Sequence, residues 1–138
     1  MFSGKLQFEI NDREFQKSLR GTLKNVGVGS EEGVRKTVYE ISEETLQQVP
    51  RQYGTLASSY QFKIRSSGAI ILAELGYGRN GDPVDKRTGK RASEYMIPVH
   101  EDLEAVHEVG KAKYLEDPWR KHAPKFRQNI ADSVNKYL

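Results

Sequence analysis

Cysteine is absent from the 138-residue chain. This absence excludes disulfide bonds and thiolate metal sites, so the fold depends on its core alone. Long apolar runs are also missing: the longest, 69–73, falls far short of the roughly 20 residues of a membrane span. The first residues carry no apolar stretch typical of a signal peptide. We therefore expect a soluble protein made in a cytoplasm, without membrane association, and a single domain over residues 1–138.

Motifs for catalysis or metal binding are lacking as well. The sequence has no HExxH pattern, no GxSxG elbow and no phosphate-binding glycine loop. The pairs His100-Glu101 and His107-Glu108 could align on a helix as metal ligands, but His122 lies in another predicted element. We interpret these histidines as ordinary surface residues.

The carboxylates Glu40, Glu43 and Glu44 recur at helical spacing. Paired carboxylates can act as acid and base in a dry cleft, but on an amphipathic helix we interpret them as the solvated side. We predict no enzymatic activity, no metal and no cofactor. A hydrolase acting through glutamate and histidine remains the weakest alternative.

Charged residues are numerous but unevenly distributed along the sequence. Segment 79–91 has five basic and two acidic residues, a surplus equal to the whole net charge of +3. Its basic residues are Arg79, Lys86, Arg87, Lys90 and Arg91. Segment 98–108 has no Lys or Arg and four acidic residues, which are Glu101, Asp102, Glu104 and Glu108. Such asymmetry bears on partners rather than on fold.

The loop 78–93, which contains the basic segment, allows three interpretations. It docks on a partner, such as the acidic segment of a neighbouring subunit; it is a solvated loop; or it contacts DNA phosphates. We favour docking, then solvation, then DNA contact. The four acidic residues are accordingly candidates for a subunit interface.

Periodicity predicts the elements of the first half of the chain. Alternation over 5–10 predicts a strand. Asn11 or Asp12 caps a following helix, whose apolar stripe has the members Phe15, Leu19, Leu23 and Val26. Residues 27–29 end this helix, Ser30 caps the next, and Pro50 ends that one.

The second half alternates strand and helix signals. Alternation over 56–65, a turn at 66–68 and an apolar arm at 69–77 predict a hairpin, with the second arm buried on both faces. Residues 94–99 suggest an edge strand, and 100–113 a short helical turn with a loop. Asp117-Pro118 opens a final helix, which Pro124 should kink or restart. Together these elements indicate an α+β fold: a small, mostly antiparallel sheet packed against two N-terminal helices and a C-terminal helix.

Three phrases in this order resemble a known family. The first joins helix to hairpin, and its defining residues are Val49, Pro50, Gly54 and Leu56, with Gln52-Tyr53 where the family often has Asp-Thr. The others are Val99-His100-Glu101 and the stretch 110–118 before the final helix. Over residues 30–135 the chain resembles the tail-completion, or head–tail joining minor capsid, proteins of long-tailed bacteriophages.

The resemblance implies a structural role without catalysis. It suggests a tail-terminator-like fold assembled as a hexameric ring in the neck or tail of the virion, made in the host bacterium's cytoplasm. The implied partners are head connector or stopper proteins, tail tube or tail terminator proteins, and genomic DNA passing through the lumen. The alternative is a small nucleic-acid-binding or regulatory protein that acts through the basic loop.

Overall fold

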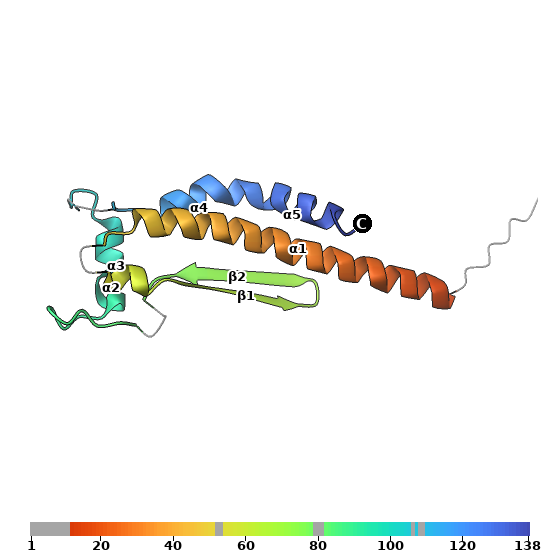
Figure 1. Cartoon of the computed structure of the whole chain (residues 1–138), viewed down its shortest axis with the longest axis horizontal. Coiled ribbons are helices and arrows are strands. Elements are labelled where there is room, and N and C mark those ends of the chain that lie inside the picture. Colours follow the sequence, from red (N-terminus) through yellow and green to blue (C-terminus); the bar gives the residue numbers. More distant parts are fainter. Residues whose placement is uncertain (1–11, 52–53, 79–81, 106, 108–109) are drawn as a thin grey trace, which may run out of the picture.

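The structure is built along one long helix, α1 (Asp12–Gln48) (Figure 1). It is a computed structural model that describes residues 12–51, 54–78, 82–105, 107 and 110–138. Helices α4 and α5 lie along one side of α1, a β-hairpin lies along the other, and α2 and α3 gather at its C-terminal end. This arrangement is an α+β fold, as the sequence predicts. The predicted strand at 5–10 falls outside the described residues.

The predicted break between two N-terminal helices is wrong, because α1 runs unbroken through residues 27–30. Ser30 is therefore inside a helix and caps nothing. The reason is the approach of α5 (Phe126–Asn135) to two glycines: a Cβ at Gly29 would lie 2.5 Å from Val134 Cα, and one at Gly33 2.4 Å from Ile130 Cα. Glycine lowers helix stability by about 1 kcal/mol, but here it lets two backbones meet, and that packing holds the helix together.

The described residues form one sheet, the antiparallel hairpin of β1 (Gln61–Ser67) and β2 (Ile70–Gly76). One face lies toward α1, where Phe62 meets Tyr39 edge-on with ring centroids 5.4 Å apart. The predicted strand start is wrong: residues before Gln61 form a short helix, α2 (Thr55–Ser58). The second arm is not buried on both faces either, since Ile70 and Leu72 are 69% and 48% exposed.

The compact core lies at the C-terminal end of α1, and the residues of the first family phrase form part of it. Its buried members are Val49, Leu56, Tyr77, Ala92 and Tyr114. α1 ends before Pro50, as predicted, and the backbone N–H of Lys111 donates to the carbonyl of Gln48 at 2.8 Å. Gly54 has φ of 75°, a left-handed conformation that glycine adopts without strain, and it leads directly into α2.

Tyrosine hydroxyls connect this core to α1. Tyr77 is hydrogen-bonded to Thr45 at 2.9 Å, and Tyr60 is hydrogen-bonded to Ser42. Tyr114 packs edge-on against Tyr77, with ring centroids 5.1 Å apart, and donates to the carbonyl of Met96 at 2.8 Å. The hairpin end, α1 and α3 are thus joined through buried aromatic rings.

The predicted edge strand at 94–99 is wrong, because these residues lie in α3 (Ala92–Glu101). Tyr95, Met96 and Val99 have helical spacing and pack on the core, and this packing outweighs the interruption by Pro98. The predicted short helical turn at the start of 100–113 is the end of α3, and among the described residues that follow, 103–104 and 112–115 form turns.

The C-terminal part follows the prediction closely. α4 (Glu116–His122) begins beside Pro118, and Pro124 interrupts the helix with a 3-10 turn, η1 (Ala123–Lys125), before α5. The buried amide of Asn129 donates to the hydroxyl of Thr37 at 2.9 Å, which fixes α5 against α1. No helix in the described part of the chain is both long and apolar enough to cross a bilayer.

Candidate functional site

The basic loop is folded against itself rather than extended. Val84 and Arg91 form an isolated antiparallel bridge, and the N–H of Gly89 donates to the carbonyl of Asp85 at 2.7 Å. The carboxylate of Asp85 accepts the backbone N–H of Arg87 at 2.9 Å and its guanidinium at 3.0 Å. These bonds hold the pKa of Asp85 below its usual value. Two of the five basic residues therefore help to shape the loop.

Asp82, at the start of the same loop, holds the first turn of α3. It accepts the backbone N–H of Ser93 at 2.9 Å and its hydroxyl at 2.5 Å, and these bonds lower the pKa of the aspartate. Arg91 donates to the carbonyl of Asp82 at 3.2 Å. Lys86 and Lys90 are exposed and have no side-chain partner among the described residues, so they are the cations available to a partner. Arg79 lies outside the described residues.

The acidic segment is likewise partly engaged. Glu101 is paired with Lys113 and lies 2.8 Å from His100 Nδ1. Hydrogen bonds from Lys113 and then His100 lower the pKa of this carboxyl. One oxygen of Asp102 accepts backbone N–H groups of Glu104 and Ala105 at 3.0 and 3.2 Å.

Of the four acidic candidates, Glu104 is exposed without a side-chain partner in the described part of the chain, and Glu108 lies outside that part. The described basic residues of the loop precede α3 or begin it, and Glu101, Asp102 and Glu104 end or follow it, so the two sets lie at opposite ends of that helix, about 15 Å apart. Among the described residues, contact between the two sets would therefore need a second copy.

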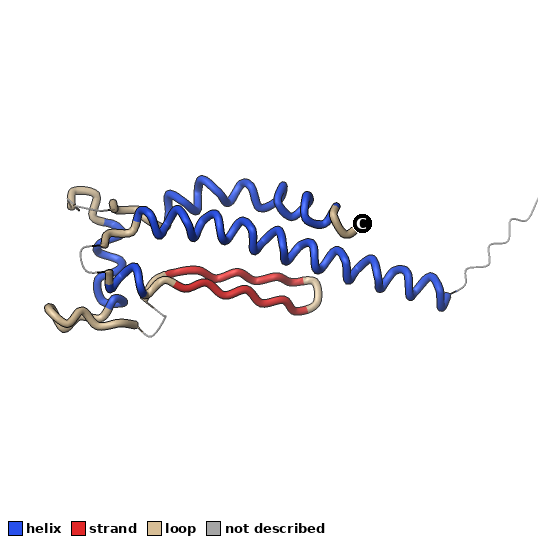
Figure 2. The backbone as a smooth tube through the Cα atoms, viewed as in Figure 1, coloured by secondary structure: helices blue, strands red, loops and turns tan. Residues whose placement is uncertain are grey.

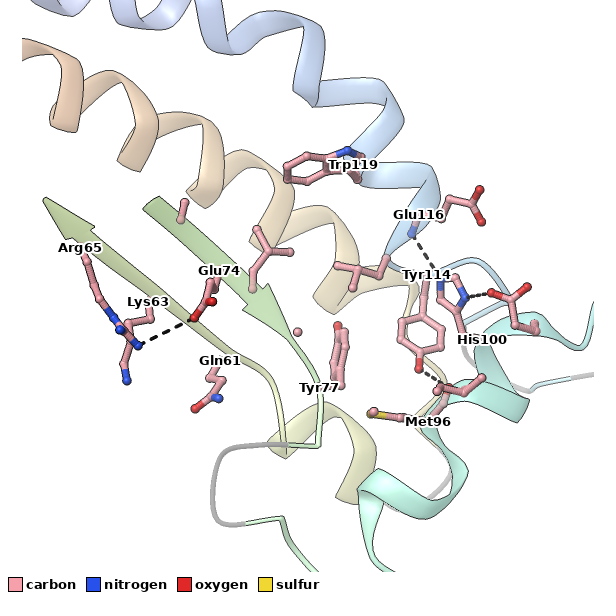
Figure 3. A pocket seen from close by; sticks show the side chains of 16 residues that line it. Gln61, Lys63, Arg65, Glu74, Tyr77, Met96, His100, Tyr114, Glu116 and Trp119 are labelled. Carbon is pink, nitrogen blue, oxygen red and sulfur yellow. Dashed lines mark hydrogen bonds and ion pairs between the residues drawn. The ribbon is translucent and has the colours of Figure 1, made fainter. Parts of the chain in front are cut away.

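Among the described residues, one group brings three possible metal ligands together: His100, Glu101 and Glu116. The ammonium of Lys113 already lies between the carboxylates, 3.0 Å from Glu116. The N–H of Glu116 donates to His100 Nε2 at 3.3 Å, so both ring nitrogens have partners (Figure 3). The group therefore joins α3 to α4 as a structural cluster, and His107 is not part of it.

Glu40 and Glu44 are not simply the solvated side of α1, which corrects the interpretation from sequence. His122 of α4 is buried between them, with Nε2 2.5 Å from Glu44 and Nδ1 3.6 Å from Glu40. Burial opposes the ionisation of Glu44, but the bonds from His122 and Lys121 outweigh it and hold its pKa below the usual value. Glu43 is exposed, as predicted. No signal in the sequence indicates that His122 lies beside Glu44, which is 78 positions away.

The N-terminal part of α1 projects beyond the C-terminal helix and the hairpin (Figures 1 and 2). We call residues 13–25 the projecting arm, because each of them is exposed. At the end of the arm that meets the rest of the molecule lies Asn25, whose side-chain amide donates to the backbone carbonyl of Tyr137 at 3.1 Å. Three of the four members of the apolar stripe predicted from sequence lie on this arm, where Phe15, Leu19 and Leu23 are 56%, 46% and 61% exposed. The fourth, Val26, lies just past the arm and is half-buried.

A groove of about 1220 Å³ lies between the hairpin, α3 and α4 (Figure 3). Its apolar lining includes Leu75, Met96, Ile97, Leu115 and Trp119. Two of these side chains remain largely in water: Ile97 is 62% and Trp119 44% exposed. The sequence predicted neither the groove nor the exposure of the arm. The stripe on the arm was visible in the sequence as a spacing of four residues.

Comparison of the chain with protein-family models, curated proteins and solved structures finds no significant match. Function must therefore be inferred from the geometry of the described residues together with the sequence resemblance described above.

Proposed function

We propose that the chain is a structural subunit of a bacteriophage particle. Copies of it assemble into a ring, of six subunits as the family resemblance implies, that completes the tail and joins it to the head connector. The genome passes through the lumen of this ring. The proposal covers both tail completion and head closure as positions in the neck.

One observation carries the proposal: α1 extends past its partner helix and leaves an apolar stripe in water. Phe15, Leu19 and Leu23 are about half exposed among the described residues, so complete burial would add to each about half of the 1.5–3 kcal/mol that a fully exposed side chain gains. A short uncovered helix is also only marginally stable in water, and Gly21 weakens this one further. Assembly would cover the stripe, so the shape suits a subunit better than a free-standing monomer.

The charged ends of α3 support the same proposal. Lys86 and Lys90 lie before the helix, and Asp102 and Glu104 follow it. A ring uses head-to-tail contacts, in which one surface of each copy meets a different surface of the next. Opposite charges on the two surfaces favour that order over like-to-like pairing.

Mass spectrometry of purified particles tests the proposal. We expect the protein in the virion at a few copies, and we expect a deletion strain to accumulate heads and tails that are not joined. Absence from purified virions, together with normal joined particles in the deletion strain, would contradict the structural role.

A second candidate function has one specific observation in its favour. The projecting arm carries four cations at successive helical spacings on one side, and all are exposed: Arg13, Lys17, Arg20 and Lys24. Like charges three or four residues apart destabilise a helix by about 0.2–0.5 kcal/mol per pair, which suggests an external anionic partner. The chain would then bind nucleic acid through this ridge, with the basic loop as an additional contact.

This candidate is tested by duplex DNA binding over a range of salt concentrations. Each phosphate neutralised contributes a slope of about 0.9 to the fall of log K with log salt. We expect Lys17→Gln with Arg20→Gln to reduce the slope by about 2, and Lys86→Gln with Lys90→Gln serves as the comparison for the loop. Undetectable or salt-independent binding by the unaltered chain excludes the candidate.

A further inference from the structure

The projecting arm presents a narrow apolar surface suited to a groove. Phe15, Leu19 and Leu23 are separated by four residues each, so they lie on one side of the helix over about 12 Å. Peptide helices that dock in grooves use anchors at this spacing. All three side chains are about half exposed or more, and residues 13–25 lie beyond the reach of α5.

The groove at the other end of the molecule has the matching character. Its apolar lining comes from β2, α3 and α4, and the side chains of Ile97 and Trp119 stand in it largely uncovered. In Figure 3 Trp119 points from α4 toward the hairpin, above the space that Tyr77 and Met96 border from below. An apolar segment placed there would cover surface that the described residues leave in water.

The arm cannot fill the groove of its own chain. Tyr77, which lines the groove, is hydrogen-bonded to Thr45, 26 residues further along α1 than Leu19. In a continuous helix this separation is about 39 Å. α1 therefore holds the arm and the groove of one chain apart. Contact between an arm and a groove requires a second copy.

Coverage of apolar surface favours the groove over a second arm as the docking partner. Two arms packed through their stripes would leave Ile97 and Trp119 of the groove exposed, whereas docking in the groove covers both apolar surfaces. The four basic side chains of residues 13–25 are centred about 130° around the helix from the stripe, so they stay in water in this contact.

We propose that the projecting arm of one copy docks in the groove of the next, with its apolar stripe against Ile97 and Trp119. The inference rests on the proposed self-assembly and names the surfaces that perform it. The contact is heterologous, because two different surfaces meet, and it closes into a ring when the rotation between copies divides a circle. The footprint of the arm is on the order of 350 Å² per partner, less than a standard interface, so we expect assembly to depend strongly on concentration.

The first test uses the sole tryptophan of the chain, Trp119, as a reporter within the groove. As the full-length protein is concentrated, we expect its emission to shift to shorter wavelength over the same range in which sedimentation shows assembly. The variant Leu19→Gln, Leu23→Gln should raise the concentration needed for both changes at least about tenfold. Ser18→Gln, which is exposed but turned about 100° away from Leu19 on the helix, should leave both unchanged. Circular dichroism verifies that the variants stay folded.

The second test uses the absence of native cysteine. Leu19→Cys and Ile97→Cys are prepared as separate, differently tagged variants, mixed and oxidised. A disulfide between the two variants is the expected product. A disulfide between two Leu19→Cys copies would indicate arm-to-arm pairing and overturn the inference.

The outcomes separate this inference from the proposed function. If copies assemble but the arm variants do not shift the assembly and no mixed disulfide forms, the docking surfaces are wrong while the ring stands. If the chain stays monomeric at every concentration, self-assembly fails, and the docking inference fails with it.

Discussion

Gly33 of α1 and Ile130 of α5 are so close that a Cβ on the glycine would lie 2.4 Å from the Cα of the isoleucine. One helical turn earlier, Gly29 has the same relationship with Val134, at 2.5 Å. The two glycines form a flat strip on which the backbone of α5 rests. Packing of α5 on this strip keeps the middle of α1 helical. It also sets the point along α1 where α5 stops covering the helix and the projecting arm begins.

The first prediction concerns this strip. Gly33→Ala should destabilise the fold by about 1–3 kcal/mol, because the new methyl group meets backbone that cannot yield without moving α5. Gly27→Ala is the matched control: it lies in the same helix with nothing within 4 Å, and it should stabilise by about 0.5–1 kcal/mol. Urea unfolding of both variants measures the difference. Equal effects in the same direction would contradict the close packing of α5.

The second prediction concerns the pH dependence of the tyrosine core. Burial raises the pKa of Tyr77 and of Tyr114 above the ordinary value of about 10. The unfolded chain therefore loses these phenolic protons at lower pH than the folded chain does. The stabilisation is complete below about pH 10 and is lost as the pH rises further.

Unfolding in urea at neutral pH and above pH 10 measures this loss. Tyr114→Phe should reduce the dependence on alkaline pH, whereas Tyr39→Phe, at a half-exposed position, should retain it. An unfolding free energy that is independent of pH in this range would show that the rings are not buried as described.

The third prediction concerns the contact of α4 with α1. Glu44→Gln removes the charge that His122 and Lys121 approach, and we expect a loss of roughly 1–2 kcal/mol at neutral pH. Glu43→Gln is adjacent and exposed, so its effect should stay within about 0.5 kcal/mol. Because the pKa of Glu44 is lowered, its contribution is present above the ordinary carboxyl pKa and is lost as the pH falls.

Urea unfolding at neutral and acid pH measures both variants. The difference between the unaltered chain and Glu44→Gln should shrink at acid pH. A difference that persists unchanged at acid pH would indicate that Glu44 acts through packing and not through its charge.

The fourth prediction concerns the cap supplied by the basic loop. Asp82→Ala removes the oxygens that accept both the N–H and the hydroxyl of Ser93, so the first turn of α3 should exchange its amide protons faster. Asp102→Ala, at the other end of α3, is the comparison variant. Unchanged exchange at Ser93 in Asp82→Ala would show that the loop does not hold the helix.

Short-range sequence signals, such as proline and turn residues, predicted the ends of helices and the connection between the two strands. Pro50 ended α1, Pro124 interrupted the C-terminal helix, and a turn joined the two strands, although at residues 68–69 and not at 66–68. Signals that depend on distant partners failed. The glycines at 27–29 suggested a break because the approach of α5 is not visible in sequence, and 94–99 suggested a strand although core packing makes it helical.

In the candidate site too, features set by neighbouring residues could be predicted, whereas features set by distant residues could not. Segment composition drew attention to the basic and acidic stretches, but it could not show that Asp85 and Lys113 neutralise part of them within the chain. The stripe of Phe15, Leu19 and Leu23 was visible, whereas its exposure depends on where α5 stops. The groove joins residues from three elements and has no sequence signal at all.

Native mass spectrometry of the purified full-length chain, over a range of concentrations, shows directly whether copies of it form a ring. We expect a closed assembly of one defined stoichiometry, six copies by the family resemblance, which dissociates when Leu19 and Leu23 are replaced by glutamine. A chain that remains monomeric at every concentration, or that forms only a two-fold dimer unaffected by those replacements, would contradict it.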